Sequence, residues 1–202
     1  MFSYLAQKMI YRGMRKILEY DQFINEMWDS NIDVTPVRKD FRKDEVANYE
    51  FEIDGSVYNV FIVGRRYDDA PDDLQIELHF SSKKEGSSDF TNELTGKNNM
   101  QKVMAGVWKS LIQWTKEVSK GGNLVSLIIS SKSEEQGDER RAKIYADFIA
   151  RKASQTGMKI TGTEDITDAY NLMMSAFGNT NDTSITTKYL VDNFPIDNLK
   201  SL

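Results

Sequence analysis

The sequence predicts an α/β domain of the α+β type, built on a mixed β-sheet with an extra helix at the N-terminus. Residues 49–80 contain stretches in which apolar and polar residues alternate, as in strands joined by antiparallel hairpins. Two later stretches, 100–118 and 138–156, carry apolar residues at helical spacing. Between them, Leu124–Ile129 is a continuous apolar run, typical of a strand covered on both faces. Hairpins followed by alternating helix and strand indicate a mixed sheet, with helices expected on both of its faces.

Composition limits the classes of partner. A chain of 202 residues is expected to form one domain that buries roughly 70% of its unfolded surface. The net charge of −5 argues against nucleic acid, because phosphate binding requires a clustered positive excess. No run of about 18 apolar residues occurs, so we expect no membrane span. The absence of cysteine excludes disulfides and thiolate zinc sites and is compatible with a reducing compartment.

Residues 1–46 are expected to form a helical segment followed by a charged connector. Apolar residues recur at helical spacing from Phe2 to Trp28, and Gly13 interrupts them, so one long helix and two shorter pieces both fit. Residues 29–46 are polar and charged, and Pro36 disfavours a helix there. We interpret this stretch as a connector. A basic docking patch is the alternative, although acidic residues offset most of its positive charge.

The core is expected to span residues 47–177 and to open with antiparallel strands. Asp54-Gly55 predicts a two-residue hairpin turn, because glycine tolerates the positive φ that such a turn requires. The acidic segment Tyr67–Asp73 predicts a second turn. The expected strands are Tyr49–Ile53, Val57–Val63, residues 74–80 and, after a serine-rich tip, a short strand at Phe90–Leu94.

Two helices and the strand between them form the centre of the expected core. Gly121-Gly122 and Gly157 are placed to end the helices, since glycine adopts the left-handed cap conformation. A right-handed crossover would set Leu124–Ile129 beside the strand that precedes the first helix. Beyond the second helix, the pattern predicts a strand at Met158–Gly162, a helix at Glu164–Phe177 and no element in a polar tail of residues 178–202.

Several groups that the sequence places at the surface are candidate sites. Trp108 and Trp114 are expected on different sides of the first core helix, with at least one of them available to a partner. Basic residues of the second helix indicate a solvated face, with phosphate or nucleic acid as the alternative. The acidic cluster Asp68, Asp69, Asp72 and Asp73 fits a solvated turn better than a calcium or magnesium site, because it lacks the spacing of a calcium-binding loop. We therefore expect no metal.

The junction before the first core helix carries the segment Thr95, Gly96, Lys97, Asn98 and Asn99. Unpaired N–H groups and the helix dipole favour an anion at such a position. Over residues 49–163 the element order resembles the GNAT (Gcn5-related) N-acetyltransferase fold, in which this loop binds the pyrophosphate of acetyl-CoA. The family pattern is Arg/Gln-x-x-Gly-x-Gly/Ala, and this chain has Glu93-x-x-Gly96-x-Asn98, so only the central glycine is kept. The resemblance thus implies a degenerate cofactor site with no bound cofactor, and acetyl-CoA is the alternative.

The same resemblance implies two catalytic candidates. Ala142-Lys143-Ile144-Tyr145 is similar to, and one residue shorter than, the family pattern whose tyrosine protonates the leaving thiolate, which makes Tyr145 the general acid. The family also places an acidic base on the strand before the loop, which implies Glu77, with His79 beside it. Structural roles stay open for all three. The pattern around Tyr145 is also that of a core tyrosine with its hydroxyl at the edge. The alternation around Glu77 and His79 is also that of ordinary polar residues on the outer face of a strand.

A looser resemblance concerns the source. ILEYDQFINE, the TGKNN entry to the first core helix and RRAKIYADFIARKASQTG resemble segments of uncharacterised or virion-associated proteins of tailed bacteriophages. The function implied is a GNAT-like domain that binds other proteins, among them virion components or further copies of itself, in the virion or the host cytoplasm. An active acetyl-CoA-dependent N-acyltransferase is the alternative.

Overall fold

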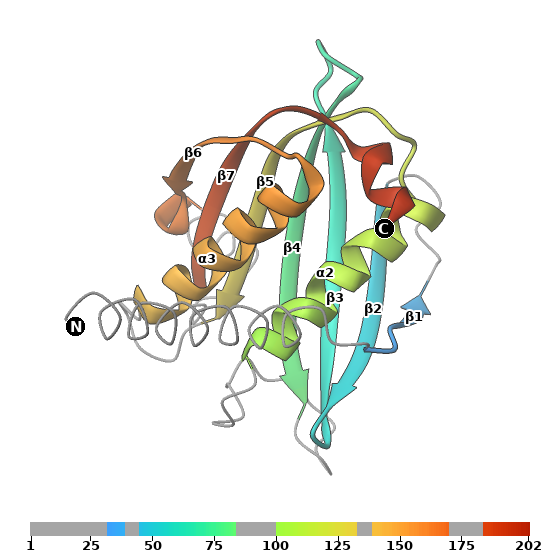
Figure 1. The fold of residues 1–202 in the computed structure, drawn as a ribbon, viewed down its shortest axis with the longest axis vertical. Helices are drawn as coiled ribbons and strands as arrows, with labels where there is room; N and C mark the ends of the chain where they lie inside the picture. Colours follow the sequence, from blue (N-terminus) through green and yellow to red (C-terminus); the bar gives the residue numbers. More distant parts are fainter. Residues whose placement is uncertain (1–31, 39–44, 84–99, 133–138, 170–183) are drawn as a thin grey trace, which may run out of the picture. The chain divides into compact units, whose positions relative to one another are not determined.

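The computed structural model describes residues 32–38, 45–83, 100–132, 139–169 and 184–202 (Figure 1). The N-terminal helix, the strand expected at Phe90–Leu94 and the loop Thr95–Asn99 lie outside these ranges. The described elements are β1 (Thr35–Arg38), β2 (Glu45–Ile53), β3 (Ser56–Arg66), β4 (Asp73–Lys83), α2 (Met100–Glu117), β5 (Asn123–Lys132), α3 (Glu139–Thr156), β6 (Ile160–Asp165), β7 (Ser184–Pro195) and the 3₁₀ helix η1 (Ile196–Ser201).

The strands form one mixed sheet in the order β1-β2-β3-β4-β5-β7-β6. Strands β4 and β5 are parallel, and α2 connects them, as expected for a crossover from the strand before the first core helix. All other neighbouring strands are antiparallel. The predicted fold class, a mixed α/β sheet in which antiparallel hairpins precede a helix-strand-helix succession, is confirmed.

The first hairpin forms where the sequence predicts it. Asp54 and Gly55 adopt φ values of 51° and 76°, the left-handed region that a tight hairpin turn requires. Ile53 then pairs with Ser56, and the register continues to Glu45 opposite Gly64. Because the residues of β2 and β3 alternate between buried and partly exposed, one face of this hairpin lies in the core.

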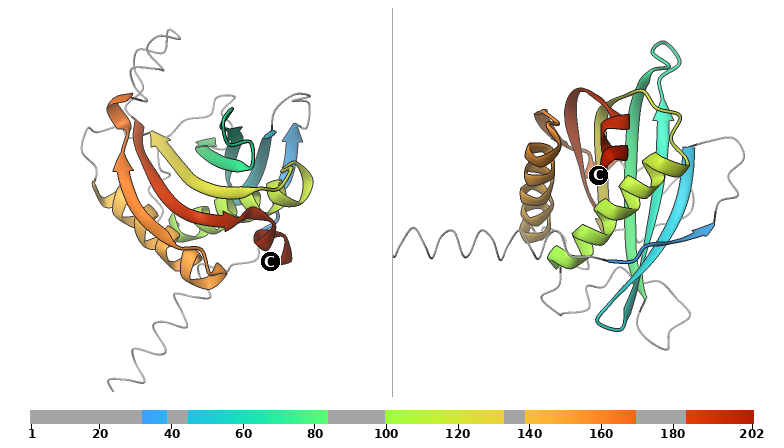
Figure 2. Two further views of the ribbon diagram at one scale, coloured as in Figure 1. Left: turned by 90° about the horizontal axis from the view of Figure 1, so that it is seen from above. Right: turned by 45° about the vertical axis from the view of Figure 1, so that its right-hand side comes forward.

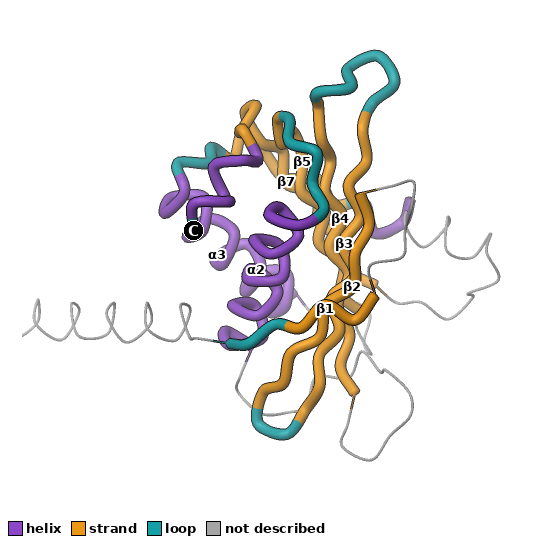
Figure 3. Tube along the Cα trace, turned by 90° about the vertical axis from the view of Figure 1, so that its right-hand side faces the viewer, coloured by secondary structure: helices purple, strands orange, loops and turns teal. Residues whose placement is uncertain are grey.

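Both described long helices cover the same face of the sheet, as the views in Figures 2 and 3 show. The expectation of helices on both faces is therefore wrong for α2 and α3. Helix α2 approaches the sheet closely at Gly106, where an added Cβ would lie 2.5 Å from the ring of Phe51. The rings of Trp108 and Phe148 meet edge to face with centroids 6.1 Å apart, which joins α2 to α3.

The prediction that a tryptophan of the first core helix is exposed is also wrong. Trp108 and Trp114 have exposed fractions of 5% and 0%. Trp114 packs under β2, where its indole N–H donates to the backbone oxygen of Glu45 at 3.2 Å. Trp108 faces α3. The helix is buried on two sides, by the sheet and by its neighbouring helix, so neither indole is available to a partner.

Two strands occur where the sequence predicts none. The connector contains β1, an edge strand that includes Pro36, a residue that edge strands tolerate. The polar tail supplies β7, which lies between β5 and β6, and η1, whose Ile196 and Leu199 are fully buried. Strand β6 ends at Asp165, so the helix predicted from Glu164 begins later, with a helical turn at residues 167–169, and the rest of it lies outside the described residues.

The glycines expected to end the helices have left-handed backbone angles. Gly121 and Gly122, after α2, have φ values of 87° and 98°, and Gly157, after α3, has φ 74°. The strand between the helices, β5, is buried at Leu124 and again from Ser126 to Ser130, in agreement with a strand covered on both faces. No helix in the described ranges is both long enough and apolar enough to cross a membrane.

Candidate functional site

The expected site lies at the edge of the sheet where the parallel strands end. Strands β4 and β5 run in the same direction, and α2 begins near their carboxyl ends (Figure 1). Thr95, Gly96, Lys97, Asn98 and Asn99 directly precede Met100, the first residue of α2, and lie outside the described residues. The crossover thus has the arrangement that a ligand site at a helix N-terminus requires, while the loop itself stays a prediction.

Tyr145 lies on the helix-covered face near this edge. Its ring meets that of Phe80, close to the end of β4, edge to face at 5.7 Å between centroids. The residue is 1% exposed, because the sheet and the neighbouring aromatic rings enclose it. Tyr145 is therefore a core residue of α3 in this structure, as the structural interpretation of its sequence pattern expects.

Tyr189 of β7 is a neighbour of Tyr145 that the sequence does not single out. Burial, and then the proximity of Tyr145, raise the pKa of Tyr189 to about 12. The residue is 2% exposed, and its hydroxyl has no hydrogen-bond partner within the described part of the chain. Tyr189 was missed because it lies in the tail for which no element was predicted.

Glu77 lies on the other face of β4 and is held by its neighbours. Arg65 donates to it from Nε at 2.6 Å, and the side-chain amide of Gln75 donates at 3.2 Å. The Nε2 atom of His79 lies 3.7 Å from the second carboxylate oxygen. Burial alone would raise the pKa of Glu77. His79 and Arg65 lower it by a larger amount, so the net pKa falls to about 2. A carboxylate this acidic is a weak general base at neutral pH.

The structure does not bring Tyr145 and Glu77 together. Phe80, which contacts Tyr145, lies three positions after Glu77 on the same strand, so the two side chains leave opposite faces of the sheet. Strand β4 pairs with β5 from Asp73 to Phe80, with one irregularity after Leu74. A hydrogen-bonded sheet therefore separates the candidate acid from the candidate base.

The environment of Glu77 predicts a dependence of stability on acidity. A carboxyl pKa that falls from 4.5 in the unfolded chain to about 2 in the folded one stabilises the fold above pH 4.5, and this contribution is lost as the pH drops toward 2. Because Arg65 is 57% exposed, solvent screening limits the contribution to about 1–2 kcal/mol. Urea unfolding across this pH range should show a shallower pH dependence for Glu77→Gln than for the wild type. Glu52→Gln, on an exposed position of β2, is the control, and equal slopes in the two variants would contradict the prediction.

A second charged cluster, absent from the sequence predictions, joins four segments. Arg66 donates to Glu45 from Nε and Nη2 at 2.6 and 2.8 Å, and also to the backbone oxygens of Pro71 and Gly121 at 2.9 and 2.7 Å. The backbone N–H of Lys120 donates to Glu45 at 2.6 Å. Glu45 is 4% exposed. These bonds tie β2 and β3 to the turn before β4 and the loop after α2, which gives the cluster a structural role.

The acidic segment Tyr67–Asp73 is a turn, as predicted. Its backbone closes with hydrogen bonds from Ala70 N–H to the Tyr67 oxygen at 3.2 Å and from Asp73 N–H to the Ala70 oxygen at 2.9 Å. Within the described ranges, no three histidine, aspartate or glutamate side chains gather as metal ligands would.

Comparison with known proteins identifies no family for this chain. No family model and no curated protein matches this sequence. Among solved structures, an acetyltransferase of the GNAT family from Streptococcus pneumoniae aligns with 75% of this chain and 68% of its own, at 9% identity and a TM-score of 0.33. The fold class is supported by the strand order and the parallel crossover of this chain and not by so weak a superposition.

Proposed function

We propose that this chain is a GNAT-like domain that acts by binding other proteins and does not turn over acetyl-CoA. The observation that carries the proposal is the separation of Tyr145 and Glu77 by the paired strands β4 and β5. Acid–base catalysis needs both groups within hydrogen-bond reach of one substrate. Tyr145 instead packs in the core, and the carboxylate of Glu77 is bound by Arg65.

The loop sequence supports the same proposal. Glu93 stands where the family pattern has arginine or glutamine, and a carboxylate repels the pyrophosphate that this loop would hold. Asn98 stands where the pattern has glycine or alanine and limits how closely a phosphate can approach the backbone. Only Gly96 keeps the residue type that the pattern requires.

The edge of the sheet offers a surface for a protein partner. In the order of the described strands, β6 comes last and pairs with β7 on one side only. Its residues Thr163, Glu164 and Asp165 are exposed. An edge strand can pair with a strand of another protein, with main-chain hydrogen bonds supplying affinity. A virion component or a second copy of this chain could bind in this way.

The phage origin and the association with virions rest on the sequence resemblance alone, and one experiment tests them. In phage lysates, the chain should sediment with assembled particles and remain with them through a high-salt wash, at a constant ratio to the major capsid protein. A phage enzyme known to stay in the host cytoplasm serves as the control. Recovery of the chain only in the slow-sedimenting fraction, together with that enzyme, would contradict the virion association.

The alternative is an active acyltransferase. The position of Tyr145 near the ends of β4 and β5 favours it, because this is the edge at which a ligand bound before α2 would lie. Such an enzyme would use Gly96 to Asn99 for pyrophosphate and Tyr145 as the acid, and Tyr145→Phe would sharply reduce its turnover. It also requires β4 and β5 to separate before Glu77 could act on the same substrate.

A further inference from the structure

The outer edge of β6 leaves main-chain hydrogen-bonding groups for a further strand. The N–H of Ile166 donates to the oxygen of Thr186 at 3.0 Å, and the same antiparallel register runs back along β6. Because bonded pairs alternate along such a ladder, Glu164 is bonded to β7, whereas Thr163 and Asp165 direct their N–H and C=O groups outward. Thr163 and Asp165 are both exposed. This edge can therefore accept a short antiparallel strand.

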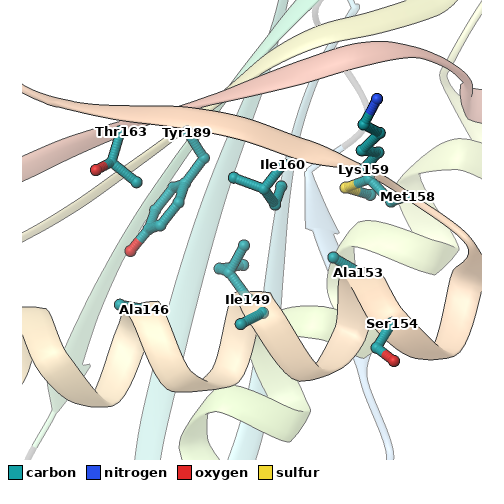
Figure 4. A pocket seen from close by; sticks show the side chains of 10 residues that line it. Ala146, Ile149, Ala153, Ser154, Met158, Lys159, Ile160, Thr163 and Tyr189 are labelled. Carbon is teal, nitrogen blue, oxygen red and sulfur yellow. The ribbon is translucent and has the colours of Figure 1, made fainter.

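The helix-covered face beside this edge is apolar and open. A groove of about 490 Å³ separates α3 from β6 and β7 (Figure 4). The side of α3 that borders the groove carries the small exposed residues Ala146, Ala150 and Ser154, each about one helical turn from the next. Thr163 of β6 lies across the groove from Ala146 in Figure 4. A partner that adds a strand to β6 must therefore also bring an apolar surface against this side of α3.

A second copy of this chain meets both requirements. A two-fold axis perpendicular to the sheet at Thr163 pairs β6 with β6 in antiparallel fashion and keeps the helices of both copies on the same face. Because side chains of β6 and β7 both line the groove opposite α3, the helix lies below these two strands. Neighbouring strands are about 4.8 Å apart, so the axes of α3 and its symmetry mate would lie about 10 Å apart. Packed helices are separated by about 8–10 Å, so the two α3 helices would be in contact.

The charges on β6 favour one register of this pairing. With Thr163 on the axis, Glu164 of one copy lies opposite Gly162 of the other, which has no side chain. Glu164 is paired with Lys188 of its own β7 at 3.4 Å, so its charge has a partner before association. A register shifted by two residues toward Asp165 would place the two Glu164 carboxylates opposite each other, which is unfavourable.

The charges on α3 are complementary under the same symmetry. Lys143 and Asp147 are both exposed and lie on either side of Ala146 along the helix. Since Ala146 lies at the level of Thr163, the axis runs the two helices antiparallel there and sets Lys143 of one copy near Asp147 of the other. Opposite charges that meet across an interface fix its register and select against other partners. The strand edge, the small side chains and the charges thus all match a second copy.

We propose that two copies of this chain associate about this axis, so that β6 of each copy extends the sheet of the other and α3 packs against α3. The inference rests on the proposed protein-binding function and names a second copy as the partner. The register irregularity between Ile160 and Gly162 limits the length of the shared strand pair. The contact between the helices therefore supplies most of the apolar surface that the dimer buries.

Sedimentation equilibrium of the full chain tests the strand pairing. The wild type should be a dimer at micromolar concentration. Thr163→Pro removes an outward N–H without breaking a bond to β7, and it should weaken dimerisation at least about tenfold, because proline blocks the addition of a strand. Thr163→Val keeps this N–H and the branched shape of the side chain, so it is the matched control and should dimerise like the wild type.

Charge reversal tests the helix contact. Lys143→Asp and Asp147→Lys should each weaken dimerisation about tenfold, because each sets like charges together at both symmetric contacts. The double variant, with the two charges exchanged, should dimerise within about threefold of the wild type, since it restores the opposite pairs. Glu52→Lys changes the net charge as Asp147→Lys does, on an exposed position of β2, and should leave dimerisation unchanged.

The inference is overturned if the wild type stays monomeric at high micromolar concentration, if a folded Thr163→Pro dimerises like Thr163→Val, or if the double charge variant dimerises no better than the single ones. If Thr163→Pro fails to fold, the charge variants still decide. A monomer that sediments with phage particles would reject the second copy as the partner and keep the protein-binding function. A dimer that turns over acetyl-CoA would keep this interface and reject that function.

Discussion

Replacing Glu45 by alanine should lower the free energy of unfolding by about 3 kcal/mol. The substitution leaves the guanidinium of Arg66 partly buried without its carboxylate, and it removes the acceptor of the Lys120 N–H. Burial alone would raise the pKa of Glu45, but the hydrogen bonds from Arg66 and Lys120 outweigh it, and the net pKa is lowered. Arg66 keeps its bonds to the oxygens of Pro71 and Gly121, so the loss stays at the lower end for a broken buried pair.

Urea unfolding at neutral pH measures this loss, and Glu52→Ala is the matched control on the same strand. Glu52 is exposed, and its removal should change the unfolding free energy by less than about 0.5 kcal/mol. The lowered pKa of Glu45 also means that its contribution is present above its unfolded-state pKa of 4.5 and is lost as the pH falls through the folded value. A loss for Glu45→Ala no larger than that for Glu52→Ala would show that the cluster does not hold these segments together.

The second large effect is expected at Gly122. This residue has φ 98°, and an added Cβ would lie 2.5 Å from the backbone oxygen of Asp72. That oxygen accepts the N–H of Asn123 at 2.8 Å, and the oxygen of Gly122 accepts the N–H of Ile196 at 3.0 Å. An alanine would thus combine a strained φ with a clash against backbone, which should cost about 3 kcal/mol in unfolding free energy.

Gly157→Ala is the control that isolates the clash. Gly157 also has a positive φ, at 74°, but an added Cβ would meet no atom within 4 Å. Alanine there should cost only the backbone strain, about 1 kcal/mol. Urea unfolding of both variants gives the difference directly. Similar losses at the two positions would mean that the loop after α2 moves away from Asp72 without cost.

The centre of the fold could be predicted from the sequence because its signals are local. The alternation of β4, the helical spacing of α2 and the apolar run in β5 each fit within one element, and short-range chirality favours their right-handed crossover. The Asp54-Gly55 turn is equally local, since its glycine is required by its own backbone angles. These predictions agree with the structure at the level of elements and topology.

Features that depend on contacts between distant segments were missed. Strand β7 has the polar run Thr186, Thr187 and Lys188 and an irregular register, and its place in the sheet comes from pairing with β5 and β6, which the local pattern does not contain. The Glu45–Arg66 cluster joins residues up to 75 positions apart. Apolar spacing on a helix shows that one side is buried but not which face of the sheet covers it, so the sequence did not reveal that α2 and α3 share one face, and the expectation of helices on both faces was wrong.

The candidate site shows the same limit. The family resemblance singled out Tyr145 on α3 and Glu77 on β4, but a match of motif and element order does not place two side chains on the same face of the finished sheet. Tyr189, the buried neighbour of Tyr145, had no local signal, because the sequence predicted no strand around it.

Our central proposal is that this chain is a GNAT-like domain without a working acetyl-CoA site, and calorimetric titration with acetyl-CoA tests it most directly. The wild type should show no micromolar binding, and Gly96→Trp, which would obstruct the backbone approach of a pyrophosphate, should give the same titration as the wild type. Micromolar binding by the wild type that Gly96→Trp abolishes would contradict the claim and support the acyltransferase instead.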